Sequence, residues 1–248
     1  MIRRYCLPVS LTPAAVMVAL LSAAWLSGCA SQPSSSESEA DPADAYTQLG
    51  TAYLERDNLP RAISALDRAL EIDPDDAEAL QAMAMVYQRQ EENDLADKYF
   101  RRALRIDSGF TRARNNYAAF LFDQGRTAEA CRQLEQATGD TQYRNRALLF
   151  ANLGQCQREL GDLDAARRSL ERAQDIAPRS PRSYFTLAEI EYSQGNYSRA
   201  WDQLQSFIRL AGITPESKRL ASAIAAARGD DDTAAFFSEQ LGSSRGAP

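Results

Sequence analysis

Apolar residues along positions 43–248 fall into pairs of helical segments that repeat at a nearly constant interval. In the first unit, Gly50 and Tyr53 mark one predicted helix, and Ala62 and Leu66 mark the second. The small residue of the first helix recurs at Gly50, Ala84, Ala118, Gly154, Ala188 and Ser222. The alanine of the second helix recurs at Ala62, Ala96, Ala130, Ala166, Ala200 and Ala234. Both series advance by 34, 34, 36, 34 and 34 residues, so a single two-residue insertion near Gly139 explains the one break in register.

The recurring small residues have a packing reason. Two antiparallel helices approach closely only where the side chains between them are small. A large residue four positions after each of the first five alanines fills the adjoining space, at Leu66, Phe100, Leu134, Leu170 and Leu204, whereas the last unit has Ser238 at this position. The turn between the helices carries a glycine at one phase, suited to a left-handed backbone, at Gly125, Gly161, Gly195 and Gly229. No sustained alternation of apolar and polar β-branched residues is present, so we expect an all-α chain without strands.

The period and the small helix crossings resemble the tetratricopeptide repeat (TPR), in which two antiparallel helices form each unit. The resemblance implies a solenoid of about six helix-turn-helix repeats forming a superhelix, because each unit stacks on the next. The predicted repeats cover about 43–76, 77–110, 111–146, 147–180, 181–214 and 215–248. We therefore expect residues 43–248 to form one TPR solenoid.

The N-terminal segment predicts export from the cytoplasm. Arg3 and Arg4 precede an almost uninterrupted apolar run from Ala14 to Leu26, which is typical of a secretory signal peptide over residues 1–28. The run is short for a membrane-spanning helix. Residues 29–42 are rich in Ser, Glu and Pro and have little to bury, so we expect a disordered tether before the repeats.

The end of the predicted signal, Leu26-Ser27-Gly28-Cys29, resembles the bacterial lipobox. The resemblance implies cleavage before Cys29 and acylation of its sulfur and amino group with chains such as palmitate. Several acyl chains hold a protein firmly in a bilayer. Ala30 follows the cysteine where an aspartate would imply retention in the inner membrane, so the implied location is the outer membrane, facing the periplasm. The alternative is an ordinary signal peptide with an incidental cysteine.

Composition excludes several kinds of chemistry. The 248 residues include no histidine, which removes imidazole-based catalytic triads and zinc sites, and we find no Gly-rich phosphate loop. The net charge is −6, and loss of Arg3 and Arg4 with the signal leaves 26 basic against 34 acidic residues, a net −8. Because no basic stripe is evident, nucleic acid is not an expected partner. We therefore expect a protein that is not an enzyme and has no cofactor beyond the covalent lipid at Cys29.

Two cysteines, Cys131 and Cys156, remain after Cys6 leaves with the signal and Cys29 is acylated. The first lies on the second predicted helix of unit three, and the other lies on the first predicted helix of unit four. Neighbouring helices of a solenoid pack together, and an exported protein meets an oxidising compartment, so we expect a disulfide between them. The alternative is two buried free thiols.

The TPR resemblance also implies a partner-binding surface. In this family the second, fifth, ninth and twelfth positions of the first helices, with the sixth nearby, line the concave side of the solenoid. The residues predicted for the groove are Leu54, Met85, Arg112, Asn115, Asn116, Phe122, Arg158, Phe185 and Tyr192. They mix apolar, amide and arginine side chains, which suits an extended peptide that needs both apolar slots and backbone hydrogen bonds. Asn116 stands out, because peptide-binding TPR proteins often use an asparagine at the sixth position to bond the peptide backbone.

The lipobox, the short tether, about six TPR units and the sequence Asn115-Asn116-Tyr117 together resemble the PilF/PilW family of type IV pilus biogenesis and stability lipoproteins. This family implies a pilotin, an outer-membrane lipoprotein that brings secretin (PilQ-like) subunits to the outer membrane and supports their multimerisation, and hence twitching motility. The alternative function of the same layout is a TPR scaffold for outer-membrane barrel assembly or for cell-wall enzymes. An enzyme hidden in the groove is the rival of a different class, and the missing histidines argue against it.

Overall fold

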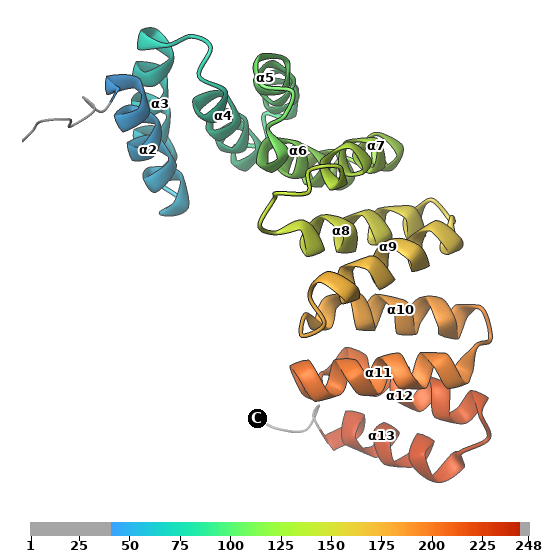
Figure 1. The fold of residues 1–248 in the computed structure, drawn as a ribbon. Helices are drawn as coiled ribbons and strands as arrows, with labels where there is room; N and C mark the ends of the chain where they lie inside the picture. The colour runs from blue at the N-terminus through green and yellow to red at the C-terminus, as the bar shows by residue number, and fades with distance from the viewer. Residues whose placement is uncertain (1–40, 244–248) are drawn as a thin grey trace, which may run out of the picture. The chain divides into compact units, whose positions relative to one another are not determined.

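The computed structural model of the chain describes residues 41–243. In this range the chain forms twelve α-helices and no strand, which confirms the predicted all-α class. The helices are α2 (Pro42–Glu55), α3 (Leu59–Ile72), α4 (Ala77–Arg89), α5 (Asn93–Ile106), α6 (Thr111–Asp123), α7 (Thr127–Thr138), α8 (Arg146–Glu159), α9 (Leu163–Ile176), α10 (Pro181–Ser193), α11 (Tyr197–Ala211), α12 (Pro215–Ala227) and α13 (Asp231–Ser243). They pack as pairs, from α2 with α3 to α12 with α13, and Figure 1 shows the pairs in chain order.

The helix boundaries differ from the predicted repeat boundaries at two places, by one residue each. Helix α2 begins at Pro42, a residue that the sequence predicts to lie in the tether. Proline is favoured in the first turn of a helix, because the backbone N–H that it lacks would have no hydrogen-bond partner within the helix there. Helix α8 begins at Arg146, the last residue of the predicted third unit. The predicted signal peptide over 1–28, Cys29 and all but the end of the tether lie outside the described residues. None of the helices within 41–243 combines the length and the hydropathy that a membrane-spanning segment needs.

The small residues lie at the closest helix crossings. A Cβ atom added to Gly50 would lie 2.5 Å from Cγ of Leu66, and one added to Gly154 would lie 2.5 Å from Cγ of Leu170. Both leucines are fully buried, so neither can move aside. In the last pair, Ser222 replaces the small apolar residue and its hydroxyl lies 2.8 Å from that of Ser238, a polar contact where the other pairs have an apolar one.

The turn inside every pair contains one residue in the left-handed region. Four of these are the predicted glycines, with φ between 72° and 81°. In the first two pairs the same position holds Asp57 (φ 56°) and Glu91 (φ 62°). The backbone geometry of the turn is therefore kept in all six pairs, and in the first two it strains a residue that has a Cβ atom.

Replacing Glu91 by glycine should raise the free energy of unfolding by about 1 kcal/mol, because glycine removes the steric cost of the left-handed backbone. The Glu91 side chain is exposed, so little packing is lost. Urea denaturation of the full chain would measure the gain. Asp57→Gly is the matched comparison: it relieves the same strain but removes the ion pair from Arg89 to Asp57 at 2.8 Å, so its gain should be smaller. A loss of stability in Glu91→Gly would contradict the assignment of strain to this turn.

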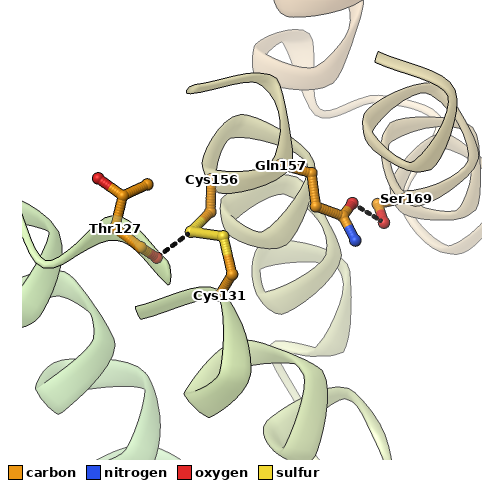
Figure 2. Close-up of a disulfide and its surroundings, with 5 residues drawn as sticks. All are labelled: Thr127, Cys131, Cys156, Gln157 and Ser169. Atoms are coloured by element: carbon orange, nitrogen blue, oxygen red, sulfur yellow. Dashed lines mark hydrogen bonds between the residues drawn. A yellow bond between two sulfur atoms is a disulfide. The ribbon is translucent and has the colours of Figure 1, made fainter. Parts of the chain in front are cut away.

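A disulfide joins the third pair to the fourth. Cys131 of α7 and Cys156 of α8 are bonded through their sulfurs, with their Cα atoms 5.6 Å apart, within the usual range for this bond. Figure 2 shows the bond between the two helices, with the carbonyl oxygen of Thr127 3.3 Å from Sγ of Cys156. Next to it, the Ser169 hydroxyl donates a hydrogen bond of 2.7 Å to the side-chain oxygen of Gln157, which ties α8 to α9.

The loop that carries the predicted insertion lies between the two cysteines. Residues 139–145 connect α7 to α8, whereas the other connections between successive pairs are shorter, at residues 73–76, 107–110, 177–180 and 212–214. Direct packing links α2 to α4, α4 to α6, α8 to α10 and α10 to α12. Between α6 and α8, the Asn152 amide donates a hydrogen bond of 3.0 Å to Asn115 Oδ1. The disulfide therefore spans the one junction where the repeat has its longer connection.

Candidate partner-binding surface

Three adjoining pockets follow the first helices of the last four pairs, and together we call them the groove. The first, of about 360 Å³, lies mainly against α6 and α8, with Phe122, Asp123, Asn152, Gln155 and Arg182 on its wall. The second shares Gln155 and Arg182 with the first and extends to α10 and α11. The third shares Phe185 and Glu189 with the second and reaches Glu216, Arg219 and Leu220 of α12.

The groove has apolar walls that the fold holds in place. Phe122 is partly buried against the core cluster that includes Phe120, Leu134 and Cys156. Phe185 of α10 and Phe207 of α11 pack with ring centroids 4.9 Å apart, and both line the second pocket. Because each ring is fixed by its neighbours while part of it faces the groove, the walls offer preformed slots for apolar side chains.

Amide side chains lie between these aromatic rings. Asn152 is held by its hydrogen bond to Asn115, and Gln155 Oε1 accepts a hydrogen bond of 3.2 Å from Arg182 Nη2. A primary amide has two donors and an acceptor with two lone pairs, so each keeps capacity for a further bond. Amides at this spacing between apolar slots can bond the backbone of an extended peptide.

Most charges of the groove are already paired. The Arg158 guanidinium donates to Glu189 and, at 3.0 Å, to Glu159. Burial alone would lower the pKa of Arg158, but the hydrogen bonds and attraction from the two glutamates outweigh it, so its pKa lies above the ordinary arginine value. Arg219 pairs with Glu216 at 3.1 Å. Arg158 is therefore a fixed, permanently charged part of the wall.

Three of the nine residues predicted for the groove line it: Phe122, Arg158 and Phe185. They come from three different helices, so the repeat spacing brings them to one surface. Their role in binding a partner stays a prediction.

Leu54 does not reach a partner surface, and its assignment to the groove is wrong. Its side chain is 3% exposed and belongs to the core cluster with Leu66, Met83 and Val86. Helix α2 packs directly on α4, which contributes Met83 and Val86 to this cluster. A leucine at this border position gains more by turning into the core than by facing water.

The asparagine that stood out in the sequence is engaged within the chain. The Asn116 amide lies 3.5 Å from Met85 Sδ, and Met85 Sδ also accepts a hydrogen bond of 3.0 Å from Gln81. Asn115 holds Asn152, as described above. Two predicted residues, Met85 and Asn116, thus contact each other on the surface between α4 and α6, beside the groove and not on the pocket walls described above.

The remaining two predicted residues have intramolecular contacts as well. Arg112 pairs with Glu78 at 3.0 Å, and its guanidinium lies 5.3 Å from the centre of the Phe110 ring. Tyr192 is partly buried and packs on Tyr197 with ring centroids 5.7 Å apart. Both side chains therefore support the helix pairs, and neither lines the three pockets.

The sequence prediction missed several groove residues. Asn152 is the sixth residue of unit four, the position at which Asn116 was singled out one unit earlier, so the same rule could have found it. Phe207 lies on α11, a second helix, and a rule restricted to first helices has no means of finding it. It reaches the groove because its ring packs on Phe185.

A further hollow of about 620 Å³ lies between α2 and α3. Tyr46, Leu49 and Tyr53 form its apolar part, and Tyr46 and Leu49 are 37% and 44% exposed. Arg61 lies 5.7 Å from the centre of the Tyr53 ring. This surface offers a second place where an apolar segment could dock.

No cluster of three or more His, Cys, Asp or Glu side chains arranged to hold a metal ion occurs within residues 41–243.

Family models described as tetratricopeptide repeat match residues 41–108, and also 82–144, 121–181 and 151–212. The chain is 36% identical over 236 residues to the type IV pilus assembly protein PilF of Pseudomonas aeruginosa, covering 93% of both chains. A solved structure of Pseudomonas aeruginosa PilF matches with a TM-score of 0.74 and 36% identity, covering 81% of this chain and 90% of that one. The crystal structure of PilW, described as a widely conserved type IV pilus biogenesis factor, matches with a TM-score of 0.71 and 26% identity, covering 80% and 91%.

The family-model matches together span residues 41–212, which hold the first five helix pairs, and the fold shared with PilF is the TPR solenoid predicted from the residue spacing. The chain belongs to the PilF/PilW family of type IV pilus TPR proteins.

Proposed function

We propose that this protein is a pilotin: anchored in the outer membrane by a lipid at Cys29, it binds secretin subunits in the periplasm and promotes their placement and multimerisation there. The observation that carries the proposal is the 36% identity to a type IV pilus assembly protein across 93% of both chains. A relative that matches over nearly its full length supports a common task better than a shared repeat does.

The mechanism needs recognition and no bond-breaking step. An extended segment of a secretin subunit would place apolar side chains against Phe122 and against the Phe185–Phe207 pair, and its backbone would bond the amides of Asn152 and Gln155. The groove is held by helix packing, so little ordering is needed when the segment binds. The partner is a polypeptide, and the protein has no need of a cofactor.

The lipid anchor determines where the protein holds the secretin subunit that it has bound. A subunit held by an anchored protein is confined near the outer membrane, which raises its local concentration where the pore must assemble. Two or more acyl chains make such an anchor durable. Cys29 lies outside the described residues, so the anchoring step rests on the lipobox resemblance alone.

Replacing Cys29 by serine should release the protein from the outer membrane and leave secretin in the wrong membrane. Membrane fractionation with immunodetection of both proteins would measure this, with surface pili and twitching as the downstream readout. The matched control is Cys6→Ser, which changes a cysteine inside the predicted signal and should leave both proteins in place. Normal secretin placement beside a released Cys29→Ser protein would contradict the delivery mechanism.

A further inference from the structure

Two charges of opposite sign on the wall of the first groove pocket have no charged partner within residues 41–243. Asp123 is the last residue of α6, and Arg182 is the second residue of α10. Both side chains are exposed and line the same pocket. The one hydrogen bond of the Arg182 guanidinium goes to the neutral Gln155 oxygen at 3.2 Å. No ion pair within 4.0 Å joins the two residues to each other.

The positions of these charges do not help the helices that carry them. The N-terminal end of a helix bears partial positive charge and the C-terminal end partial negative charge. Arg182 lies in the first turn of α10 and Asp123 ends α6, so each lies at the end that disfavours its sign. Helix stability therefore gives no reason for either residue.

Two other arginines at helix starts differ in this respect, because each has an acceptor within the fold. Arg112, the second residue of α6, pairs with Glu78 at 3.0 Å. Arg146, the first residue of α8, donates to the Thr138 carbonyl at 3.3 Å. The fold itself thus accounts for these two arginines, whereas Arg182 and Asp123 keep their charges for something else.

The surroundings of the two charges match the needs of a peptide. Phe122 precedes Asp123 in α6, and Phe185 follows Arg182 by one helical turn in α10. The amides of Asn152 and Gln155 line the same pocket. The other charges along the groove are already neutralised by ion pairs, so Asp123 and Arg182 are the ones available to select a ligand.

We propose that the first pocket receives an extended polypeptide segment bearing one acidic and one basic side chain, the carboxylate against Arg182 and the cation against Asp123. Apolar side chains of the segment fill the slots at Phe122 and Phe185. Because the two wall charges differ in sign, a segment running in the reverse direction would bring like charges together, so the pair fixes the direction of binding. This inference rests on the proposed function in one respect: it takes the groove as the surface that binds the partner. It does not require that the partner be a secretin.

The test uses the full-length protein in detergent and two sets of fluorescent synthetic peptides. The first set covers the periplasmic part of the secretin from the same genome in overlapping segments. The second set contains designed peptides with one Glu, one Arg and flanking Phe or Leu, in which the separation and the order of the two charges are varied. Anisotropy titrations compare the wild type with Arg182→Glu and Asp123→Arg. Matched controls are Arg199→Glu and Asp202→Arg, exposed charges on α11 that do not line the groove pockets.

A designed peptide with one charge order should bind the wild type, and each groove variant should weaken it about tenfold, which corresponds to about 1.4 kcal/mol. The control variants should bind like the wild type. A peptide with Gln in place of Glu should bind the wild type more weakly than the original peptide does. The Arg182→Glu variant should bind the Gln peptide no more weakly than the original one. The double variant Arg182→Glu/Asp123→Arg should prefer the peptide with the opposite charge order.

Two results would overturn the inference: binding that is the same in Arg182→Glu, Asp123→Arg and the controls, or no binding by any peptide of either set. The proposed function is judged separately by the secretin set. Secretin segments that bind with no dependence on Asp123 or Arg182 would overturn the inference and leave the pilotin function in place. Charge-dependent binding of designed peptides alone would support the inference and count against secretin as the partner.

Discussion

Replacing Cys131 and Cys156 together by serine should lower the free energy of unfolding by about 3 kcal/mol. The bond closes a loop between residues 25 positions apart, and this loop holds the 139–145 connection between α7 and α8. Without the bond, the unfolded chain regains the freedom of that loop while the folded chain loses a link across the junction of the third and fourth pairs. Both cysteines are nearly fully buried, so the serine hydroxyls also need partners in an apolar surrounding.

Urea denaturation of the wild type and the double-serine variant, without reductant, would measure the difference. Wild-type protein treated with dithiothreitol is the matched control and should approach the stability of the variant, whereas the variant itself should not respond to dithiothreitol. Equal stability of the variant and the untreated wild type would contradict a structural role for the bond. It would favour the alternative that the two cysteines are free thiols.

Replacing Gly154 by valine should be equally severe, with a loss of about 3 kcal/mol. The first added carbon would lie 2.5 Å from Cγ of Leu170 and 3.1 Å from the carbonyl oxygen of Ala166, and the two methyl groups would intrude further. Leu170 is fully buried, and the α9 backbone cannot shift without moving the rest of the pair. The change therefore forces α8 and α9 apart over their whole contact.

Denaturation of Gly154→Val would measure this loss, and the double variant Gly154→Val/Leu170→Ala separates the clash from other causes. Leu170→Ala alone should cost about 2 to 5 kcal/mol through the cavity it leaves. If the clash is with Leu170, the double variant should lose less free energy of unfolding than the two single variants lose in sum. Gly109→Ala is the neutral control, since its Cβ would meet only the flexible side chain of Asp107 at 3.3 Å. Additive losses in the double variant would show that the crossing is not limited by Leu170.

The fold could be predicted from sequence because one structural need recurs at each repeat. Each helix pair is indicated by a small residue at the crossing, a large residue beside it and a left-handed residue in the turn. Gly154 and Leu170 are an example of the small and the large residue at one crossing. The left-handed residue at Glu91 was not predicted, because the turn of that unit has no glycine to signal it. Repetition of the spacing thus carried information that single residues did not.

The partner surface was predicted only in part, because repeat position fixes where a Cβ points and not where the side chain ends. At the twelfth position Arg158 reaches the groove wall, while Leu54 turns into the core. The long, charged side chain must keep its end near water, and the leucine has no such need. Phe207 lines the groove although it belongs to the second helix of its pair, so a rule that considers only first helices cannot predict it.

Capture of secretin from detergent-solubilised outer membranes, with the tagged, lipid-bearing full chain as bait, tests the pilotin function most directly. Secretin multimers should be recovered with the bait and be absent from a tag-only control. Arg199→Glu bait, altered on α11 away from the groove, should recover as much secretin as the wild type. A correctly lipidated bait that recovers barrel-assembly proteins or cell-wall enzymes, and no secretin, would contradict the proposed function.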